Sequence, residues 1–241
     1  MTISFFILLF VTALLYASVG HGGASGYLAL MAIYGFAPEV MKPTALMLNL
    51  FVSLTSFLLF FKGGHFKWKF FLPFALASIP FSFLGGTITL EVAVYKKILG
   101  LLLLFPVMRF FFFSAKDSKK LKEPTLFLSL IIGATIGFLS GLIGIGGGIL
   151  LSPILLLLNW TDQKQTAAIS ALFIFVNSMA GLAGQYSKGF NVDSMLVGYV
   201  LIAFAGGLVG AWMGSLWLNQ RMLKYTLAAV LLMASVKLMF T

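Results

Sequence analysis

The feature that most constrains this chain is its succession of long apolar runs. Six or more of them could each form a helix of about 20 residues, which crosses a hydrocarbon layer roughly 30 Å thick. Hydrophobic residues make up 61% of the sequence and charged residues only 9%, whereas a soluble domain averages about 25% charged residues. The alternation of apolar and polar residues typical of a membrane barrel is absent. We therefore predict an all-α polytopic membrane protein.

The apolar segments fall into two sets of about five that match in order and length. The first set occupies residues 3–19, 24–36, 43–61, 70–90 and 94–113, and the second 125–143, 147–158, 166–185, 194–217 and 222–240. Such a layout is typical of internal duplication in transporters. It predicts a first transmembrane repeat over 1–113, a basic linker over 114–124 and a second transmembrane repeat over 125–241.

Individual residues repeat as well. Gly20, Gly22 and Gly23 align with Gly144, Gly146 and Gly147 at an offset of 124 residues. Further pairs follow at offsets of 125 and 128, namely Gly64 with Gly189, Gly86 with Gly214, and Lys96 with Lys224. A slowly drifting offset is what loop insertions produce after a duplication.

Basic loops predict the orientation, because Lys and Arg concentrate on the cytoplasmic side. The linker 114–124 and the loop 62–69 are both rich in lysine, so we expect both in the cytoplasm. Ten crossings would make the halves inverted repeats, with both termini outside. If 24–36 and 147–158 are re-entrant, eight crossings and parallel halves result. We favour inverted repeats, and we assign the net charge of +10 to topogenic loops and not to nucleic-acid binding.

Two glycine clusters, at 20–26 and 144–148, each precede an unusually short apolar segment. Consecutive glycines break a helix, and broken backbone at membrane depth persists only where it is buried in protein or lines a cavity. A helix that restarts there presents unpaired N–H groups and a partial positive charge, which favour anions. The alternative is close helix packing. We expect packing to explain the glycines at a spacing of four, namely Gly133, Gly137, Gly141, Gly206, Gly210 and Gly214.

All six acidic residues lie in loops or at segment ends, so the apolar runs contain no Asp or Glu. A buried cation site or a carboxylate proton relay therefore has no evident host. An intramembrane enzyme would need paired carboxylates, a histidine-based metal cluster or an activated serine. With two histidines, 44 residues apart, and no cysteine, the chain is expected to have no catalytic residues, metal or cofactor.

Polar side chains inside the third segment of each half complete the candidate site, since hydroxyl and amide groups suit an oxyanion. The opposing interpretation is that they form hydrogen bonds between helices. His21, in the first glycine cluster, could cap a helix, pair with the anion or titrate near neutral pH. The predicted substrate-binding residues are Gly20, His21, Gly22, Gly23, Ser25, Asn49, Ser53, Gly144, Gly146, Gly147, Gly148, Ser170, Asn177 and Ser178.

Four motifs carry a resemblance to a known family. They are GIGGGILLSPILLL at 144–157, KGGHFKW at 62–68, SKGF at 187–190 and GHGGASGYL at 20–28. With the duplicated layout, they make the whole chain resemble the sulfite exporter TauE/SafE family, also called the toluene-sulfonate uptake permease family. The resemblance implies a permease of two similar halves in the inner membrane of a bacterium or archaeon. It also implies sulfur-containing anions as substrates, often exported.

The leading hypothesis is a secondary transporter, acting as an exporter, that binds a small anion such as sulfite or a sulfonate between the two breaks. Access would alternate as one repeat moves against the other. An anion channel, a permease for a non-sulfur organic acid and an accessory subunit stay open as alternatives. The expected partners are the anion and the lipid bilayer, without nucleic acid; the sequence leaves open whether the protein forms homo-oligomers.

Overall fold

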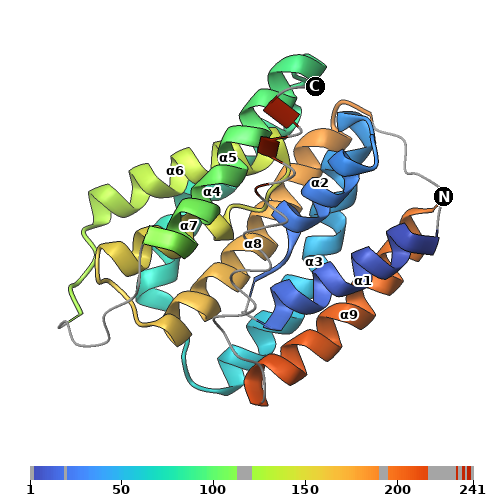
Figure 1. The fold of residues 1–241 in the computed structure, drawn as a ribbon. Helices are drawn as coiled ribbons and strands as arrows, with labels where there is room; N and C mark the ends of the chain where they lie inside the picture. Colours follow the sequence, from blue (N-terminus) through green and yellow to red (C-terminus); the bar gives the residue numbers. More distant parts are fainter. Residues whose placement is uncertain are drawn as a thin grey trace.

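The computed structural model describes residues 3–18, 21–112, 121–189, 195–216 and, near the C-terminus, 232, 235, 236, 238 and 239. Within these residues the chain forms nine helices and no strand (Figure 1). The helices are α1 (Ile3–Ser18), α2 (Ala24–Ile33), α3 (Pro38–Lys62), α4 (Trp68–Thr87), α5 (Val92–Phe112), α6 (Leu126–Ile143), α7 (Gly148–Leu157), α8 (Gln163–Tyr186) and α9 (Leu196–Leu216). Gly20, Lys224, most of the predicted segment 222–240 and most of the linker 114–124 lie outside the described residues.

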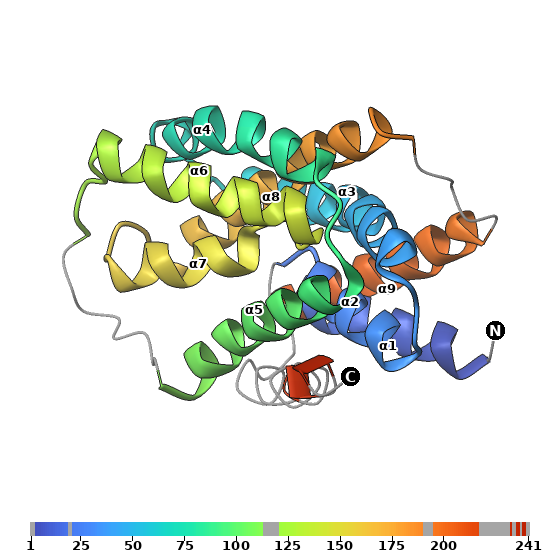
Figure 2. The same cartoon turned by 90° about the horizontal axis from the view of Figure 1, so that it is seen from above.

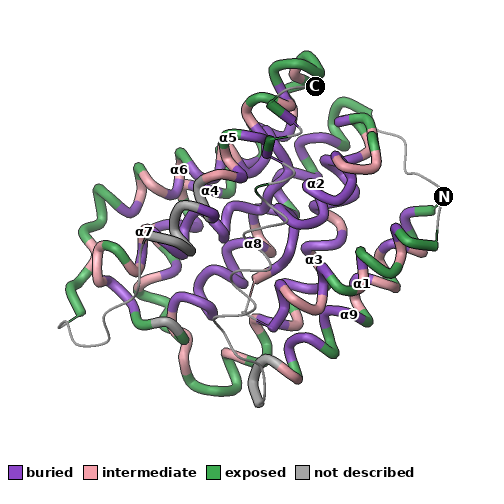
Figure 3. The backbone as a smooth tube through the Cα atoms, in the orientation of Figure 1, coloured by how far each residue is buried: buried purple, intermediate pink, exposed green. Residues whose placement is uncertain are grey.

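Five helices are long and apolar enough to cross a membrane: α3, α4, α6, α8 and α9. Their outward-facing side chains are apolar, as Leu76 (69% exposed), Phe127 (76%) and Leu201 (62%) show. Helix α8 differs from the others, because 78% of its apolar window is buried inside the protein; it runs through the middle of the bundle (Figure 3). These features confirm the predicted all-α polytopic membrane protein.

The short helices α2 and α7 each contain 10 residues, about 15 Å of helix, and each folds back on the helix before it. The Tyr34 hydroxyl, just after α2, donates a hydrogen bond of 2.9 Å to Ser4 Oγ near the start of α1. In the second half, Lys122 N, before α6, donates to Asn159 O, after α7, at 2.8 Å. Each glycine cluster is therefore the tip of a helical hairpin, α1–α2 or α6–α7.

The two hairpins enter the bundle from opposite ends (Figure 2). Helix α1 begins at one end and α6 at the other, which is the arrangement expected of inverted halves. The loops that the charge rule assigns to the cytoplasm lie at the same end, since Lys69 Nζ and Glu123 Oε2 form an ion pair of 2.9 Å. This contact joins the start of α4 to the segment that precedes α6.

The long contacts of the bundle cross between the two halves of the sequence. Helix α1 packs along α9, and α6 packs along α4. Helix α3 also contacts α9, and α8 contacts α4. We define the first body as α1, α2, α3 and α9, and the second body as α6, α7, α8 and α4. Each body thus combines three helices of one half with one helix of the other, and α3 and α8 meet between them.

Glycines bring the helices of each body into backbone contact. A Cβ on Gly133, Gly137 or Gly141 of α6 would collide with the backbone of α4 at Phe74, Ser78 or Ser82. On α9, a Cβ on Gly206 or Gly210 would collide in the same way with Phe10 or Leu14 of α1. The packing interpretation is confirmed for these five glycines. The surroundings of Gly214 are outside the described residues.

We expect Gly137→Ala to lower the stability of the protein in detergent, because backbone cannot move aside as a side-chain end can. Overpacking of this kind costs about 1–3 kcal/mol, and each kcal/mol shifts the Tm by about 2–4 °C in a chain of this size. Gly198→Ala on α9 is the matched control, since a Cβ there meets no atom within 4 Å. If the Gly137→Ala variant has the same Tm as the Gly198→Ala control, the packing assignment is contradicted.

Candidate functional site

Glycine is required at both hairpin tips by the backbone itself. Gly23, which precedes α2, has φ +98°, and Gly144, Gly146 and Gly147 have φ +88°, +72° and +76°. This left-handed region is accessible to glycine and rarely occupied by other residues. The prediction that the clusters break the helices is therefore confirmed. Gly20, also a candidate, lies outside the described residues.

The amides at both tips lack acceptors. Residues 22–26 and 145–149 are buried, and no described residue accepts a hydrogen bond from any of their backbone N–H groups. Paired amides flank each run: His21 N donates to Tyr16 O and Gly144 N to Ser140 O. More than nine in ten buried backbone N–H groups in proteins are paired. Two runs of unpaired donors inside a membrane protein therefore point to a missing acceptor.

The two tips meet on one pair of side chains, Asn49 of α3 and Ile174 of α8. A Cβ on Gly22 would lie 2.9 Å from both Asn49 Oδ1 and an Ile174 methyl carbon. A Cβ on Gly146 would collide with Asn49 Nδ2 and lie 3.0 Å from the same methyl carbon. Tips that are 124 residues apart in sequence thus converge at the contact between the first and second bodies.

Polar atoms at this junction are incompletely paired. Asn49 Nδ2 donates to Ser178 Oγ at 3.3 Å, linking α3 to α8. Asn49 Oδ1 and Ser53 Oγ have no hydrogen-bond partner among the described residues, although both side chains are completely buried. The Cβ of Ser53 would lie 3.3 Å from a Cβ on Gly22, so this hydroxyl belongs to the same junction. A ligand with both donors and acceptors would satisfy these groups.

A second polar cluster joins the first tip to the second body. His21 Nε2 lies 3.1 Å from Ser152 Oγ on α7. Ser152 Oγ also lies 2.8 Å from Ser170 Oγ on α8 and donates to Gly148 O at 2.8 Å. Both serines are fully buried.

A buried cation lies beside the second tip. Lys42 is only 9% exposed, and its Cα would be 3.1 Å from a Cβ on Gly144. Its Nζ donates to Ile88 O, at the C-terminal end of α4, at 3.2 Å. A positive charge is favourable at a helix C-terminus, so this lysine stabilises the fold and also biases the region toward negative ligands.

Two predicted site residues serve other contacts. The Ser25 hydroxyl donates to the Tyr16 hydroxyl at 2.8 Å and so ties α2 to α1. Asn177 Nδ2 donates to Ser78 Oγ of α4 at 3.0 Å and to Phe173 O at 2.8 Å. For Asn177 the alternative of hydrogen bonding between helices describes the observed contacts, although its Oδ1 has no described partner.

Sequence reasoning missed two residues of the junction. Ser152 had a usable signal, because it is the single polar side chain in α7. The apolar side chain of Ile174 gave no sign of a binding role, but this residue aligns with Asn49 at an offset of 125. The acidic residues that the structure describes, Glu39, Glu91, Glu123 and Asp162, lie at helix starts or in loops. Within the described residues, no group of His, Cys, Asp and Glu could hold a metal.

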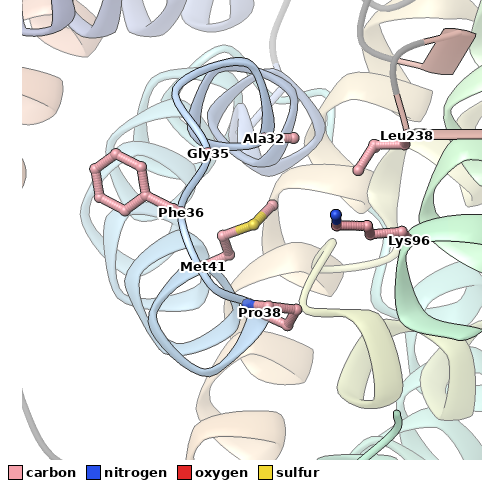
Figure 4. Close-up of a pocket in the computed structure, with 7 residues that line it drawn as sticks. All are labelled: Ala32, Gly35, Phe36, Pro38, Met41, Lys96 and Leu238. Atoms are coloured by element: carbon pink, nitrogen blue, oxygen red, sulfur yellow. The ribbon is translucent and has the colours of Figure 1, made fainter. Parts of the chain in front are cut away.

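A small pocket lies at the opposite end of α2 from the glycine tip (Figure 4). Its volume is about 120 Å³, and apolar side chains such as Phe36, Met41 and Leu238 line it. Lys96 of α5 points into the pocket and is the charged residue of its lining. The pocket is thus separate from the amide-lined junction.

Comparison with known proteins gives one family and several relatives. The family model described as "Sulfite exporter TauE/SafE" matches residues 5–238. The chain is 40% identical to the probable membrane transporter protein y4hK of Sinorhizobium fredii, over 96% of this chain and 95% of that protein. It is 28% identical to a probable membrane transporter protein of Methanocaldococcus jannaschii, over 81% and 76% of the two chains. It is 29% identical to the probable membrane transporter protein YunE of Bacillus subtilis, over 73% and 69%. No solved structure matches.

Aligned glycines at the two tips should respond differently to substitution. Gly146→Ala forces a side chain into left-handed backbone at φ +72°, which costs about 1–2 kcal/mol, and it also displaces Asn49. Gly22→Ala, whose φ is not in this region, only displaces side-chain ends. We expect the lower Tm for Gly146→Ala in detergent. Equal Tm values for the two variants would show that alanine at position 146 causes no measurable backbone strain.

Proposed function

The chain belongs to the sulfite exporter TauE/SafE family of membrane transporters, and from this premise we propose that it is a secondary transporter of small sulfur-containing or organic anions, such as sulfite and sulfonates, acting as an exporter. We place it in the cytoplasmic membrane of a bacterium or archaeon, with the basic linker in the cytoplasm. The assignment of sulfur chemistry rests on the family, and that of an anion rests on the site.

The observation that carries the proposal is the pair of unpaired amide runs at 22–26 and 145–149. Each run begins a helix of 10 residues, whose dipole adds a partial positive charge at the same place. Anions bind at such helix starts, and glycine lets a ligand approach the amides without a Cβ in the way. Lys42 adds a buried positive charge beside the second run.

Hydrogen-bonding side chains at the junction suit a small oxyanion. The Ser53 hydroxyl has no partner among the described residues and can donate to the anion. Asn49 Nδ2 and the Ser178 hydroxyl, which are bonded to each other, are further donors. The remaining contact is Ile174, which suits the apolar part of an organic anion. A metal cation would find no carboxylate among these residues.

Burial of the junction favours a carrier over a channel. Asn49 and Ser178 are 0% exposed and Ile174 is 3% exposed. A conducting pore would leave such groups open to water along a continuous path, whereas a carrier passes through a state in which the site is closed. A channel is the second candidate function, and flux measurements distinguish it from a carrier.

Access would alternate between the first and second bodies and not between the two sequence halves. Backbone contacts at the glycines hold α1 to α9 and α4 to α6, so these pairs cannot separate without losing close packing. The α3–α8 contact between the bodies carries the Asn49–Ser178 hydrogen bond and borders the amide-lined junction. We therefore expect α3 and α8 to shift against each other as the site opens.

Transport is tested by counterflow in proteoliposomes. Vesicles loaded with unlabelled sulfite or methanesulfonate should transiently concentrate the labelled anion from outside. Asn49→Asp places a carboxylate between the two tips, so we expect it to lower the rate at least about tenfold, the effect of about 1.4 kcal/mol.

Asn159→Asp, in the turn after α7, is the matched control and should retain the wild-type rate. Flux that rises linearly with concentration, together with single-channel currents, would favour the channel. Absence of flux for every anion tested would contradict the proposal.

Spin labels on introduced cysteines test which parts move, because the chain contains no cysteine of its own. A pair at Leu76 of α4 and Ile131 of α6 reports a distance within the second body. A pair at Leu76 and Leu201 of α9 reports a distance between the bodies; all three side chains are exposed. We expect a saturating anion to change only the second distance. A change confined to the first pair would contradict the assignment of the bodies.

A further inference from the structure

The contact between His21 and Ser152 fits an arrangement of hydrogens in which the histidine donates. A serine hydroxyl has one hydrogen to donate and two lone pairs to accept. The Ser152 hydroxyl donates to Gly148 O at 2.8 Å, so its two accepting positions are filled by the Ser170 hydroxyl at 2.8 Å and by His21 Nε2 at 3.1 Å. In this arrangement His21 carries a hydrogen on Nε2. Both the neutral ring with that tautomer and the imidazolium meet this condition, so the contact persists when the ring takes up a proton.

This contact also crosses between the bodies. His21 precedes α2 in the first body, while Ser152 and Ser170 belong to α7 and α8 in the second. A movement of the bodies that opens the anion site therefore changes what surrounds the imidazole. The ring directly precedes the run of unpaired amides at 22–26, so its charge acts on whatever acceptor binds there.

Few other titratable groups lie on the elements around His21. Helix α1 carries Tyr16, α2 carries Tyr27, and α7 carries none. Helix α8 carries Lys164 and Tyr186, and α3 carries Glu39, Lys42 and Lys62; of these, Lys42 lies beside the second tip and the others near helix ends. Histidine is the side chain whose charge ordinarily changes between pH 5 and 8. No carboxylate on these helices competes for the proton at the junction.

We propose, on the basis of the proposed transport function, that His21 is the proton-coupling residue: it takes up one proton together with one anion and releases both on the other side. Net export then requires an outward anion gradient larger than the opposing proton gradient. Protonation places a positive charge beside the anion, so proton and anion each strengthen the binding of the other, as reciprocal linkage requires. The proton adds to the imidazole nitrogen and leaves from it, and no covalent bond other than N–H forms or breaks.

The predicted duplication suggests the number of coupled protons. The residues that align with His21, Ser152 and Ser170 in the other half are Ile145, Leu28 and, at an offset of 125, Ala45. None of them can hold a proton. The two tips supply amides in pairs, but one tip alone supplies an imidazole, so one proton accompanies each anion.

The test uses proteoliposomes of the full chain with a pH gradient and no gradient of the anion. Methanesulfonate is the probe, because it stays a monoanion over the whole pH range and cannot carry the proton itself. With the membrane potential clamped, one proton per anion should concentrate the probe about tenfold for each unit of pH, whereas two protons would concentrate it about a hundredfold.

His21→Gln should abolish this accumulation. Counterflow should continue at a lower rate, because exchange of anion for anion needs no net proton movement but the protonated ring also strengthens anion binding. His65→Gln is the matched control, because His65 lies in the loop before α4 and should behave as wild type. Counterflow also shows that the His21→Gln protein is folded.

Three results would overturn the inference. Accumulation by His21→Gln equal to wild type, or wild type that only equilibrates the probe while showing counterflow, would remove His21 from coupling and leave the proposed function intact. Hundredfold accumulation in wild type would contradict the single proton. Absence of counterflow in the wild type would overturn both the inference and the proposed function.

Discussion

The rest of this structure depends on one constraint: where water is excluded, backbone N–H and C=O groups must find partners within the protein. Helices satisfy it along most of the chain. The two glycine tips do not, since their amides at 22–26 and 145–149 have no described acceptor, and each buried unpaired donor costs about 1–3 kcal/mol. The tips can persist because α3 and α8 cover them and keep them from lipid. The same lack of partners gives the junction its affinity for an acceptor.

Close packing elsewhere offsets the cost of the unpaired amides. In a membrane, apolar side chains gain little by leaving lipid for protein, so helices associate through close van der Waals contact and hydrogen bonds. Glycines of α6 and α9 supply that contact against α4 and α1. Because these contacts join helices from different halves, they build two bodies, and the α3–α8 contact between the bodies carries the Asn49–Ser178 hydrogen bond.

Much of the fold followed from composition and glycine spacing. The helices, the breaks at the glycine clusters and the packing role of Gly133, Gly137 and Gly141 were all predictable. The direction in which each side chain faces was harder to predict, because most faces of these helices are apolar and lipid is as apolar as the core. Asn177 and Ser178 illustrate the limit. Adjacent residues on a helix point about 100° apart, and the sequence did not indicate that Ser178 faces α3 while Asn177 faces α4.

The crossed pairing of helices has a consequence for how the protein is made. Helix α1 is the first to be synthesised, yet the glycine face that it packs against lies on α9, near the end of the chain. Helix α4 is likewise synthesised before α6, the helix against which it packs. During synthesis α1 and α4 must therefore stay in the bilayer without these neighbours. The second body is complete once α8 has been made, whereas the first body is complete only when the ribosome has passed residue 216.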